Sequence, residues 1–247
     1  MKYIILVLVA LLLAPARPVA AAGLPDVDGD RLLDAWEQVL GTNPYDSDSD
    51  QDGFNDWIEI VNNYDPLGPS KKTTAQDHDG DGLDDRLELL FGSDPTNPDT
   101  DADGKKDGQE IAQGFSPTST STRPLPKTIE IKLSTQKLKQ KLGGVVLAEY
   151  PVSTGKKSTP TPPGVYKTQN KIARAWSSHA KLWMPWWMQF SSRGMGLHEL
   201  PEWPGGRKEG VKSLGTPASG GCVRLGVGPA KILYDWTPIG TPVIIVK

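Results

Sequence analysis

The stretch Ser219-Gly220-Gly221-Cys222-Val223-Arg224 is the most informative part of the sequence for the fold and the chemistry of the chain. Cys222 is the only cysteine in the 247 residues, so it has no disulfide partner within the chain. A single cysteine is an inert buried thiol, half of an intermolecular bridge, or a nucleophile. The two preceding glycines permit a tight turn that presents the sulfur beside backbone N–H groups. With His198 upstream as a base, these are the minimum residues for cysteine-based acyl transfer.

The N-terminus has the pattern of a secretory signal peptide. Met1-Lys2-Tyr3 precedes an apolar run from Ile4 to Ala14, and small residues follow at Ala20-Ala21-Ala22. The run is shorter than the roughly 20 apolar residues that cross a bilayer, although an uncleaved anchor is the alternative interpretation. We therefore expect residues 1–22 to be removed. The mature chain would be extracytoplasmic, in the periplasm or at the cell wall or surface, without a membrane anchor.

Charge divides the chain into two parts. Residues 23–120 contain 24 acidic and 6 basic side chains, whereas residues 121–247 contain 6 acidic and 19 basic ones. Such asymmetry predicts two modules with different partners. The basic balance of the second part suits an anionic cell wall, although lysines that offset the acidic neighbour would look the same. We expect no nucleic-acid partner.

The acidic part contains four segments with one spacing. They are DVDGDRLLDAWE from Asp26, DSDQDGFNDWIE from Asp48, DHDGDGLDDRLE from Asp77 and DTDADGKKDGQE from Asp99. Each has aspartates at loop positions 1, 3, 5 and 9 and a glutamate at position 12, a spacing that wraps a calcium ion. The predicted ligands are Asp26, Asp28, Asp30, Asp34, Glu37, Asp48, Asp50, Asp52, Asp56, Glu59, Asp77, Asp79, Asp81, Asp85, Glu88, Asp99, Asp101, Asp103, Asp107 and Glu110.

The four loops form a duplicated pair. The first loop maps onto the third and the second onto the fourth, both at an offset of 51 residues. A short amphipathic helix is predicted after the first and third loops, and Gly41 and Gly92 are its stop signals. Four matches in register make an acidic solvated face the weaker interpretation. The first loop is the doubtful member, because Arg31 stands where the turn prefers glycine.

This pattern, from about Asp26 to Gln113, resembles the bacterial thrombospondin type 3 calcium repeat and more loosely the EF-hand or dockerin. Asn55, Asp84 and Lys106 stand where paired EF-hands have an apolar residue, which favours the thrombospondin-like repeat. The resemblance implies structural calcium and a stiffened stalk, or a docking module for another cell-surface protein. Ion binding and folding are coupled in such modules, so we expect the module to be largely unfolded without metal.

A Ser/Thr/Pro-rich linker at residues 116–126 separates the calcium module, residues 23–115, from a second domain at residues 127–247. Strands are predicted around Ile129, at 145–150, at 165–167 and at 243–246, with one helix at 229–236. The fold class is mainly β, a β-sandwich preceded by calcium loops with short helices.

Three blocks of the second domain carry a further resemblance. They are Tyr150-Pro-Val-Ser-Thr-Gly155 with Thr159-Pro-Thr-Pro-Pro-Gly164, then Met195-Gly-Leu-His198, and then Gly215-Thr-Pro-Ala-Ser-Gly-Gly-Cys-Val-Arg-Leu225. Their order and spacing are similar to those of the L,D-transpeptidase catalytic domain of the YkuD-like family. The resemblance implies attack by the Cys222 thiolate on peptidoglycan stem peptides, with a thioester intermediate and no cofactor for catalysis.

The same resemblance implies roles for four residues. Cys222 is the nucleophile, His198 is the base, Gly221 and Cys222 offer N–H groups to the oxyanion, and Arg224 binds a stem carboxylate or braces the loop. Gly220 replaces a histidine that is frequent in the family, and Glu199 follows His198 where glycine or serine is usual. These departures place the geometry and substrate preference in question.

Three functions remain open at this stage. The first is an exported L,D-transpeptidase with a calcium-stabilised module, and the second is an L,D-carboxypeptidase or hydrolase using the same site. The third is a non-catalytic calcium-dependent wall-binding protein. Trp183, Trp186 and Trp187 are either core residues or an aromatic rim for the stem peptide or glycan, with Trp203 as another candidate.

Overall fold

A computed structural model describes residues 24–71, 76–208 and 210–247. The predicted signal peptide at residues 1–22 therefore lies outside the described residues. The chain divides into two compact units between Pro124 and Leu125, and each is treated by itself. Within the described residues, no helix has both the length and the apolar character needed to cross a membrane.

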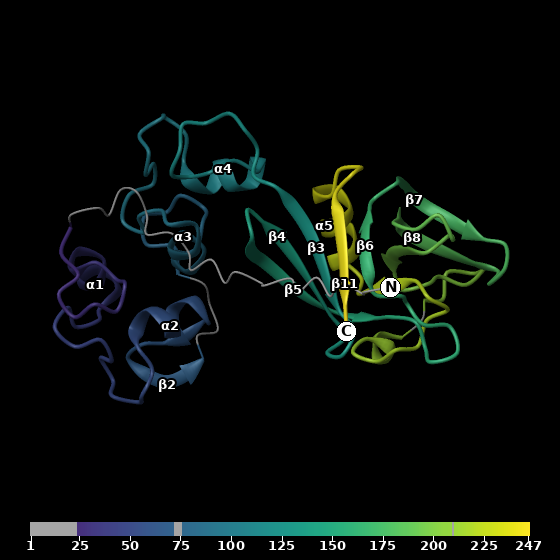
Figure 1. The fold of residues 1–247 in the computed structure, drawn as a ribbon, viewed down its shortest axis with the longest axis horizontal. Helices are drawn as coiled ribbons and strands as arrows, with labels where there is room; N and C mark the ends of the chain where they lie inside the picture. Colours follow the sequence, from purple (N-terminus) through teal and green to yellow (C-terminus); the bar gives the residue numbers. More distant parts are fainter. Residues whose placement is uncertain (1–23, 72–75, 209) are drawn as a thin grey trace, which may run out of the picture. The chain divides into compact units, whose positions relative to one another are not determined.

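In the first unit, each acidic loop leads into a helix of six or seven residues (Figure 1). The helices are α1 (Asp34–Leu40), α2 (Asp56–Val61), α3 (Asp85–Phe91) and α4 (Asp107–Gln113). Asn55 and Asp84 are the N-caps of α2 and α3, and their side chains accept hydrogen bonds from the N–H groups of Ile58 and Leu87. This capping is the physical reason for polar residues at positions that are apolar in paired EF-hands.

Helices α1 and α3 end where the sequence predicts, whereas α2 and α4 were not predicted. Gly41 follows α1 with φ of 88° and Gly92 follows α3 with φ of 80°, a left-handed conformation that glycine adopts at little cost. A small core forms from Leu32, Leu33, Trp36, Ile60 and Leu89. A short hairpin of β1 (Tyr64–Asp65) and β2 (Gly68–Lys71) follows α2.

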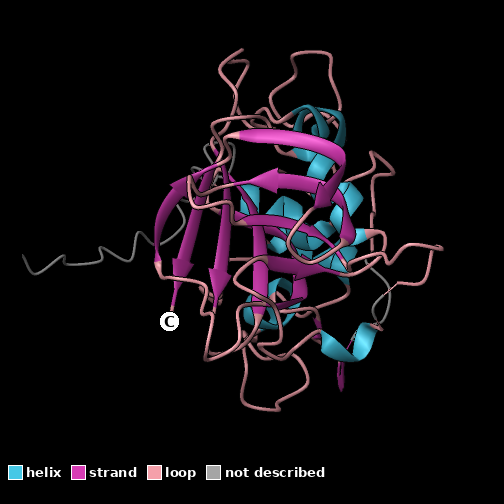
Figure 2. Ribbon diagram, turned by 90° about the vertical axis from the view of Figure 1, so that its right-hand side faces the viewer, coloured by secondary structure: helices cyan, strands magenta, loops and turns pink. Residues whose placement is uncertain are grey.

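The second unit is built on one nine-stranded sheet with the order β6-β11-β3-β4-β5-β10-β9-β8-β7, drawn as magenta arrows in Figure 2. The strands are β3 (Lys127–Lys132), β4 (Lys137–Leu142), β5 (Val145–Ser153), β6 (Gly164–Lys167), β7 (Asn170–Ser177), β8 (Leu182–Gln189), β9 (Gly196–Glu199), β10 (Val223–Leu225) and β11 (Pro242–Val246). Strand β10 lies between β5, to which it is antiparallel, and β9, to which it is parallel.

Helix α5 (Pro229–Trp236) packs against the sheet, and Leu233 is fully buried in the core with Leu197 and Leu225. Its C-terminal end is held by two lysines. Lys127 donates to the Trp236 carbonyl, and Lys171 donates to the Thr237 carbonyl at 2.8 Å. These cations satisfy carbonyl groups that a helix end leaves without intrahelical partners.

The prediction of a mainly β domain is confirmed, and the sheet curls as one continuous structure. Helix α5 has the predicted bounds, and the four predicted strands correspond to β3, β5, β6 and β11. In this sheet, the sequence analysis missed β4, β7, β8, β9 and β10. Strand β8 carries tryptophans on both faces, so the alternation typical of a half-buried strand is absent from it.

Candidate active site and candidate metal sites

The neighbouring strands β9 and β10 bring His198 and Arg224 to one face of the sheet, and the turn that carries Cys222 leads directly into β10. Arg224 is paired with His198 in the parallel register, and Cys222 lies two residues before Arg224. The Arg224 charge acts on both the Cys222 thiol and the His198 imidazole, so all three side chains are near one another. The other face carries Leu197, Val223 and Leu225, which are fully buried in the core. Three of the predicted catalytic residues therefore lie together.

His198 is held in one tautomer. Its side chain is 2% exposed, and Nδ1 lies 2.6 Å from the carbonyl oxygen of Glu199. A carbonyl oxygen can only accept, so Nδ1 carries the proton and Nε2 keeps its lone pair. Burial lowers the pKa of His198 to about 4, an effect that the Glu199 carbonyl opposes and the Arg224 charge reinforces. The imidazole is therefore neutral at pH 7 and can act as a base.

Cys222 is a partly exposed free thiol. Burial raises the pKa of the thiol above its ordinary value, while a hydrogen bond from the Gly196 backbone and the Arg224 charge lower it. Because the Cys222 pKa is raised and the His198 pKa is lowered, the resting pair is a neutral thiol beside a neutral imidazole. The thiol must then lose its proton during attack, when the base can take it.

The turn before Cys222 is closed by the side chain of Ser219. Its hydroxyl donates to the Cys222 carbonyl at 2.5 Å and accepts from the Gly221 N–H at 3.0 Å. The expectation that Gly221 offers its N–H to an oxyanion therefore needs correction, because this group already has a partner. Within the described residues, the Cys222 N–H donates no hydrogen bond, and it remains the available oxyanion donor at this turn.

The block from Thr159 to Gly164 braces this turn, which explains why the first and third sequence blocks occur together. Thr161 is 2% exposed, and its hydroxyl accepts from the Gly155 N–H at 2.8 Å and donates to the Gly221 carbonyl at 2.9 Å. Thr159 donates to the Ser219 carbonyl at 3.2 Å. Sequence reasoning missed Thr161 and Ser219 as supporting residues, although both lie inside the quoted blocks.

Glu199, the unusual residue after His198, has its side chain buried in an ion pair with Lys208. A buried carboxylate needs such a partner, because removing a charge from water is costly. Trp187 lies beside His198. Its ring lies 5.8 Å from that of His198, and a Cβ atom at Gly196 would be 2.7 Å from the indole. Glycine at position 196 therefore allows Trp187 to approach.

A cavity of about 400 Å³ adjoins the cysteine turn through Met195. An ideal Cβ atom at Gly221 would lie 3.5 Å from the Met195 sulfur, so this side chain touches both the turn and the cavity. The cavity is also lined by Tyr166 and Phe190, whose rings pack edge to face, and by the cationic side chains of Lys167 and Arg193.

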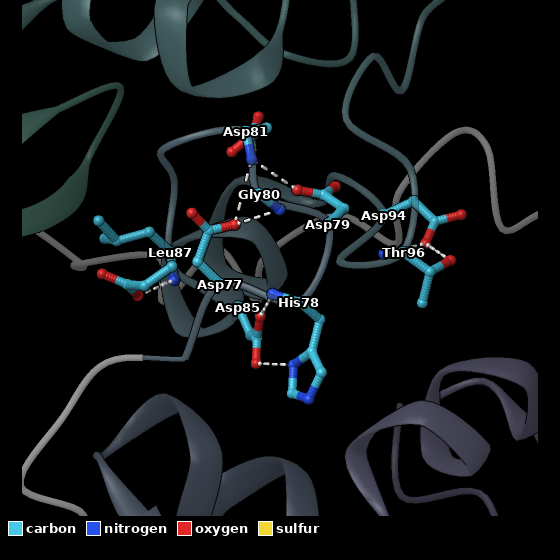
Figure 3. A network of polar contacts seen from close by, with 10 residues as sticks. Asp77, His78, Asp79, Gly80, Asp81, Asp85, Leu87, Asp94 and Thr96 are labelled. Atoms are coloured by element: carbon cyan, nitrogen blue, oxygen red, sulfur yellow. Dashed lines mark hydrogen bonds and ion pairs between the residues drawn. The ribbon is translucent and has the colours of Figure 1, made fainter.

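In the first unit, the aspartates at positions 1, 3 and 5 of each loop converge. The four groups each have carboxylate oxygens within 4.8 Å of one another, and they are Asp26, Asp28 and Asp30; Asp48, Asp50 and Asp52; Asp77, Asp79 and Asp81; Asp99, Asp101 and Asp103. The third loop curls round its group because Asp77 accepts hydrogen bonds from the Gly80 and Asp81 N–H groups (Figure 3).

The aspartate at position 9 has another role, which differs from its predicted place among the ligands. In every loop this carboxylate accepts from the N–H of position 2, and the four are Asp34, Asp56, Asp85 and Asp107. In three loops the position-2 side chain binds the second oxygen, as His78 does to Asp85 at 2.6 Å (Figure 3). These aspartates close the loops and lie outside the four groups.

The glutamate at position 12 is buried beside its own group of aspartates in each loop. Burial and the nearby aspartates raise the pKa of Glu37 to about 8 and that of Glu88 to about 9. Glu88 is fully buried, and neither of its carboxylate oxygens has a hydrogen-bond partner among the described residues. Buried carboxylates without donors fit a bound cation, and an all-oxygen set with a final glutamate fits calcium.

Arg31 adopts the same turn as glycine does in the other loops. Its φ is 94°, close to 101° at Gly53 and 100° at Gly82. A positive φ costs a non-glycine residue about 1–2 kcal/mol. The Arg31 guanidinium lies 4.9 Å from the ring of Trp57, and this cation–π contact offsets part of that cost. The first loop therefore keeps the geometry that the sequence placed in doubt.

The second unit therefore has a partly exposed cysteine and a buried histidine on neighbouring segments of a mainly β fold. Residues 126–245, which make up nearly all of the second unit, match the family model of the L,D-transpeptidase catalytic domain, YkuD. Residues 77–98 match the bacterial TSP3 repeat. No curated protein matches the chain.

Solved structures of L,D-transpeptidases are similar to part of this chain. One from Mycobacterium smegmatis has 21% identity and a TM-score of 0.45, with 50% of this chain and 60% of that chain covered. One from Stackebrandtia nassauensis has 26% identity and a TM-score of 0.43, with 58% and 68% covered. The third L,D-transpeptidase of Mycobacterium tuberculosis, with a faropenem-derived adduct, has 20% identity and a TM-score of 0.45, with 50% and 61% covered.

Proposed function

We propose that the protein is an exported L,D-transpeptidase that transfers acyl groups of peptidoglycan stem peptides through a thioester on Cys222. The observation that carries the proposal is the position of Cys222 directly before β10 and of His198 on the neighbouring β9, with His198 Nδ1 fixed by the Glu199 carbonyl. The family match and the basic second unit support it. The N-terminal pattern of residues 1–22 supports export.

The reaction follows from the neutral resting pair. The Cys222 thiol gives its proton to His198 Nε2 as sulfur bonds the carbonyl carbon of the diamino acid. The Cys222 N–H stabilises the oxyanion. The bond to D-alanine then breaks, and its nitrogen takes the proton from His198. In the second half, an acceptor amine gives a proton to His198 and attacks the thioester, and the sulfur leaves and regains a proton.

The first unit is proposed to be a calcium-stabilised module, with ligands at positions 1, 3, 5 and 12 of each loop. The buried Glu88 oxygens without donors support this proposal most directly. The module is a candidate docking surface for another cell-surface protein. Calcium has no part in the acyl-transfer steps above.

Purified protein with a disaccharide-tetrapeptide tests the activity by mass spectrometry. We expect a thioester adduct on Cys222 and a cross-linked dimer. A tripeptide product without a dimer would identify water as the acceptor and make the protein a carboxypeptidase. An unchanged substrate with no adduct would contradict the proposed enzyme and leave only a wall-binding role.

A further inference from the structure

The β7–β8 hairpin carries a row of aromatic side chains on the same sheet face as His198. Trp176 pairs with Trp183, Arg174 with Pro185 and Ile172 with Trp187 in the antiparallel register, so these side chains share a face. The opposite face packs on the core, where Trp186 lies 5.4 Å from the Tyr234 ring of α5. We use the name tryptophan stripe for Trp176, Trp183 and Trp187 with Arg174 and Glu202.

The inner end of the tryptophan stripe belongs to the candidate active site. The Trp187 ring lies 5.8 Å from that of His198 and covers Gly196, whose backbone is hydrogen-bonded to Cys222. Any substrate held at Cys222 is therefore next to this end of the stripe. The stripe then runs outward along β8 to Trp183.

The outer end of the stripe is open to solvent. Trp176 is 42% exposed, and its ring lies 4.9 Å from that of Trp183. The Arg174 guanidinium lies 4.5 Å from the centre of the Trp183 ring and pairs with Glu202 at 2.5 Å. Two backbone hydrogen bonds between Trp183 and Glu202 fix this carboxylate beside the hairpin. An exposed and rigid aromatic surface of this kind is typical of a binding site.

A peptidoglycan fragment has a stem peptide and a glycan, and the charge of the tryptophan stripe favours the glycan. Arg174 and Glu202 neutralise each other, so the pair offers no net charge to the carboxylates of a stem peptide. The same two groups provide donors and an acceptor for hydroxyl groups, and the indole rings provide flat apolar surfaces. A sugar ring presents apolar C–H faces and a rim of hydroxyls, which is the complementary chemistry.

The length of the tryptophan stripe along β8 agrees with a glycan bound at its outer end. Trp183 lies four residues from Trp187, which is roughly 13 Å along a strand. A stem peptide whose third residue is at Cys222 spans about 10 Å from that residue to its attachment to the sugar. We propose that the tryptophan stripe binds the amino-sugar chain of the substrate; this inference rests on the proposed function and adds the glycan as a determinant of specificity.

Kinetics with two substrates test the stripe. The acylation kcat/KM is measured for a disaccharide-tetrapeptide and for the same tetrapeptide without sugar, in the wild type, Trp176→Ala and Trp176→Phe. We expect the wild type to prefer the sugar-bearing substrate about tenfold, which is 1.4 kcal/mol. Trp176→Ala should lose most of this preference and Trp176→Phe should keep it. Equal losses for both substrates in Trp176→Ala, or an unchanged preference, would overturn the proposal.

Direct binding separates this inference from the proposed function. Chitotetraose is titrated into Cys222→Ser protein, and the indole N–H signals of Trp176 and Trp183 are followed by NMR. We expect chitotetraose to shift both indole signals. The Trp183 signal should no longer shift when Trp176→Ala is added. This result would support the stripe even if the wild type acylated neither substrate. Absence of any shift at millimolar chitotetraose would contradict it even if acylation proceeded normally.

Discussion

Asp81 accepts a hydrogen bond of 2.7 Å from the backbone N–H of Gly108, in the first turn of α4. The third loop is thereby tied to the helix that follows the fourth loop. The first and second loops are connected in the same way, because Asp30 accepts a hydrogen bond from the Trp57 N–H at 3.2 Å. In both pairs, an aspartate of the first group holds the helix of the second loop, so the two loops form one structural unit.

Gly108→Ala should destabilise the first unit by about 1–3 kcal/mol, although alanine favours helices by about 1 kcal/mol. The added Cβ atom would lie 2.9 Å from backbone atoms of Asp81, Gly82 and Leu83, which cannot move independently. Calcium-dependent thermal unfolding of the full chain measures this. Gln109→Ala, at the exposed next position, is the control and should stay within about 0.5 kcal/mol. A Gly108→Ala protein at least as stable as the control would refute the close approach.

Chelation should remove the unfolding transition of the first unit and leave that of the second unit in place. Without a cation, the carboxylates of each group repel one another and the buried Glu88 has no donor. Scanning calorimetry with calcium and with a chelator measures the two transitions. Acylation of Cys222 should be unchanged by the chelator. Loss of both transitions together would contradict two independent units.

Cys222→Ser should abolish covalent labelling by a carbapenem, a reagent suggested by the family resemblance. The hydroxyl of serine is a far weaker nucleophile than sulfur with the same base. Mass spectrometry of the intact protein measures the adduct. Ser192→Ala, an exposed position, is the control and should label like the wild type. An adduct on the Cys222→Ser protein would place the nucleophile elsewhere.

The stability of the second unit should fall as the pH is lowered from 7 to 4. The pKa of His198 is about 4 in the folded protein and about 6.5 when unfolded, so below pH 6.5 the unfolded state binds the additional proton. The loss should approach about 3 kcal/mol at 1.36 kcal/mol per pKa unit. Urea unfolding at several pH values measures it. The His198→Gln variant should show a flatter dependence, and an identical slope would show that other groups cause it.

Thr161→Val should destabilise the second unit by about 1–3 kcal/mol and slow acylation. The change leaves the half-buried Gly155 N–H without its acceptor and releases the Gly221 carbonyl. Thr159→Val is a matched control, because that hydroxyl is exposed and makes one longer hydrogen bond. Unfolding and carbapenem acylation rates are measured for both. Equal effects in the two variants would contradict the bracing role of Thr161.

The sequence predicted the parts of the molecule that depend on local spacing. The four aspartate loops, the Gly41 and Gly92 helix ends and helix α5 follow from residues close together in the chain. Features that depend on contacts between distant residues were missed. The Gly221 N–H was expected to be free, because nothing in the sequence shows that the Ser219 hydroxyl turns back to it. Likewise, the aromatic run of β8 does not reveal which rings face His198 and which face α5.

The Arg31 and Trp57 pair has a consequence for how the duplicated halves can change. At the offset of 51 residues, these two positions correspond to Gly82 and Gly108, so one half joins its loops with a stacked cation and ring and the other with two glycines. Tryptophan in place of Gly108 would put a side chain where backbone atoms crowd it. Glycine in place of Arg31 or Trp57 would remove one partner of the cation–π contact. The two halves are therefore not interchangeable. A recombination between them has to exchange positions 31 and 57 together with positions 82 and 108.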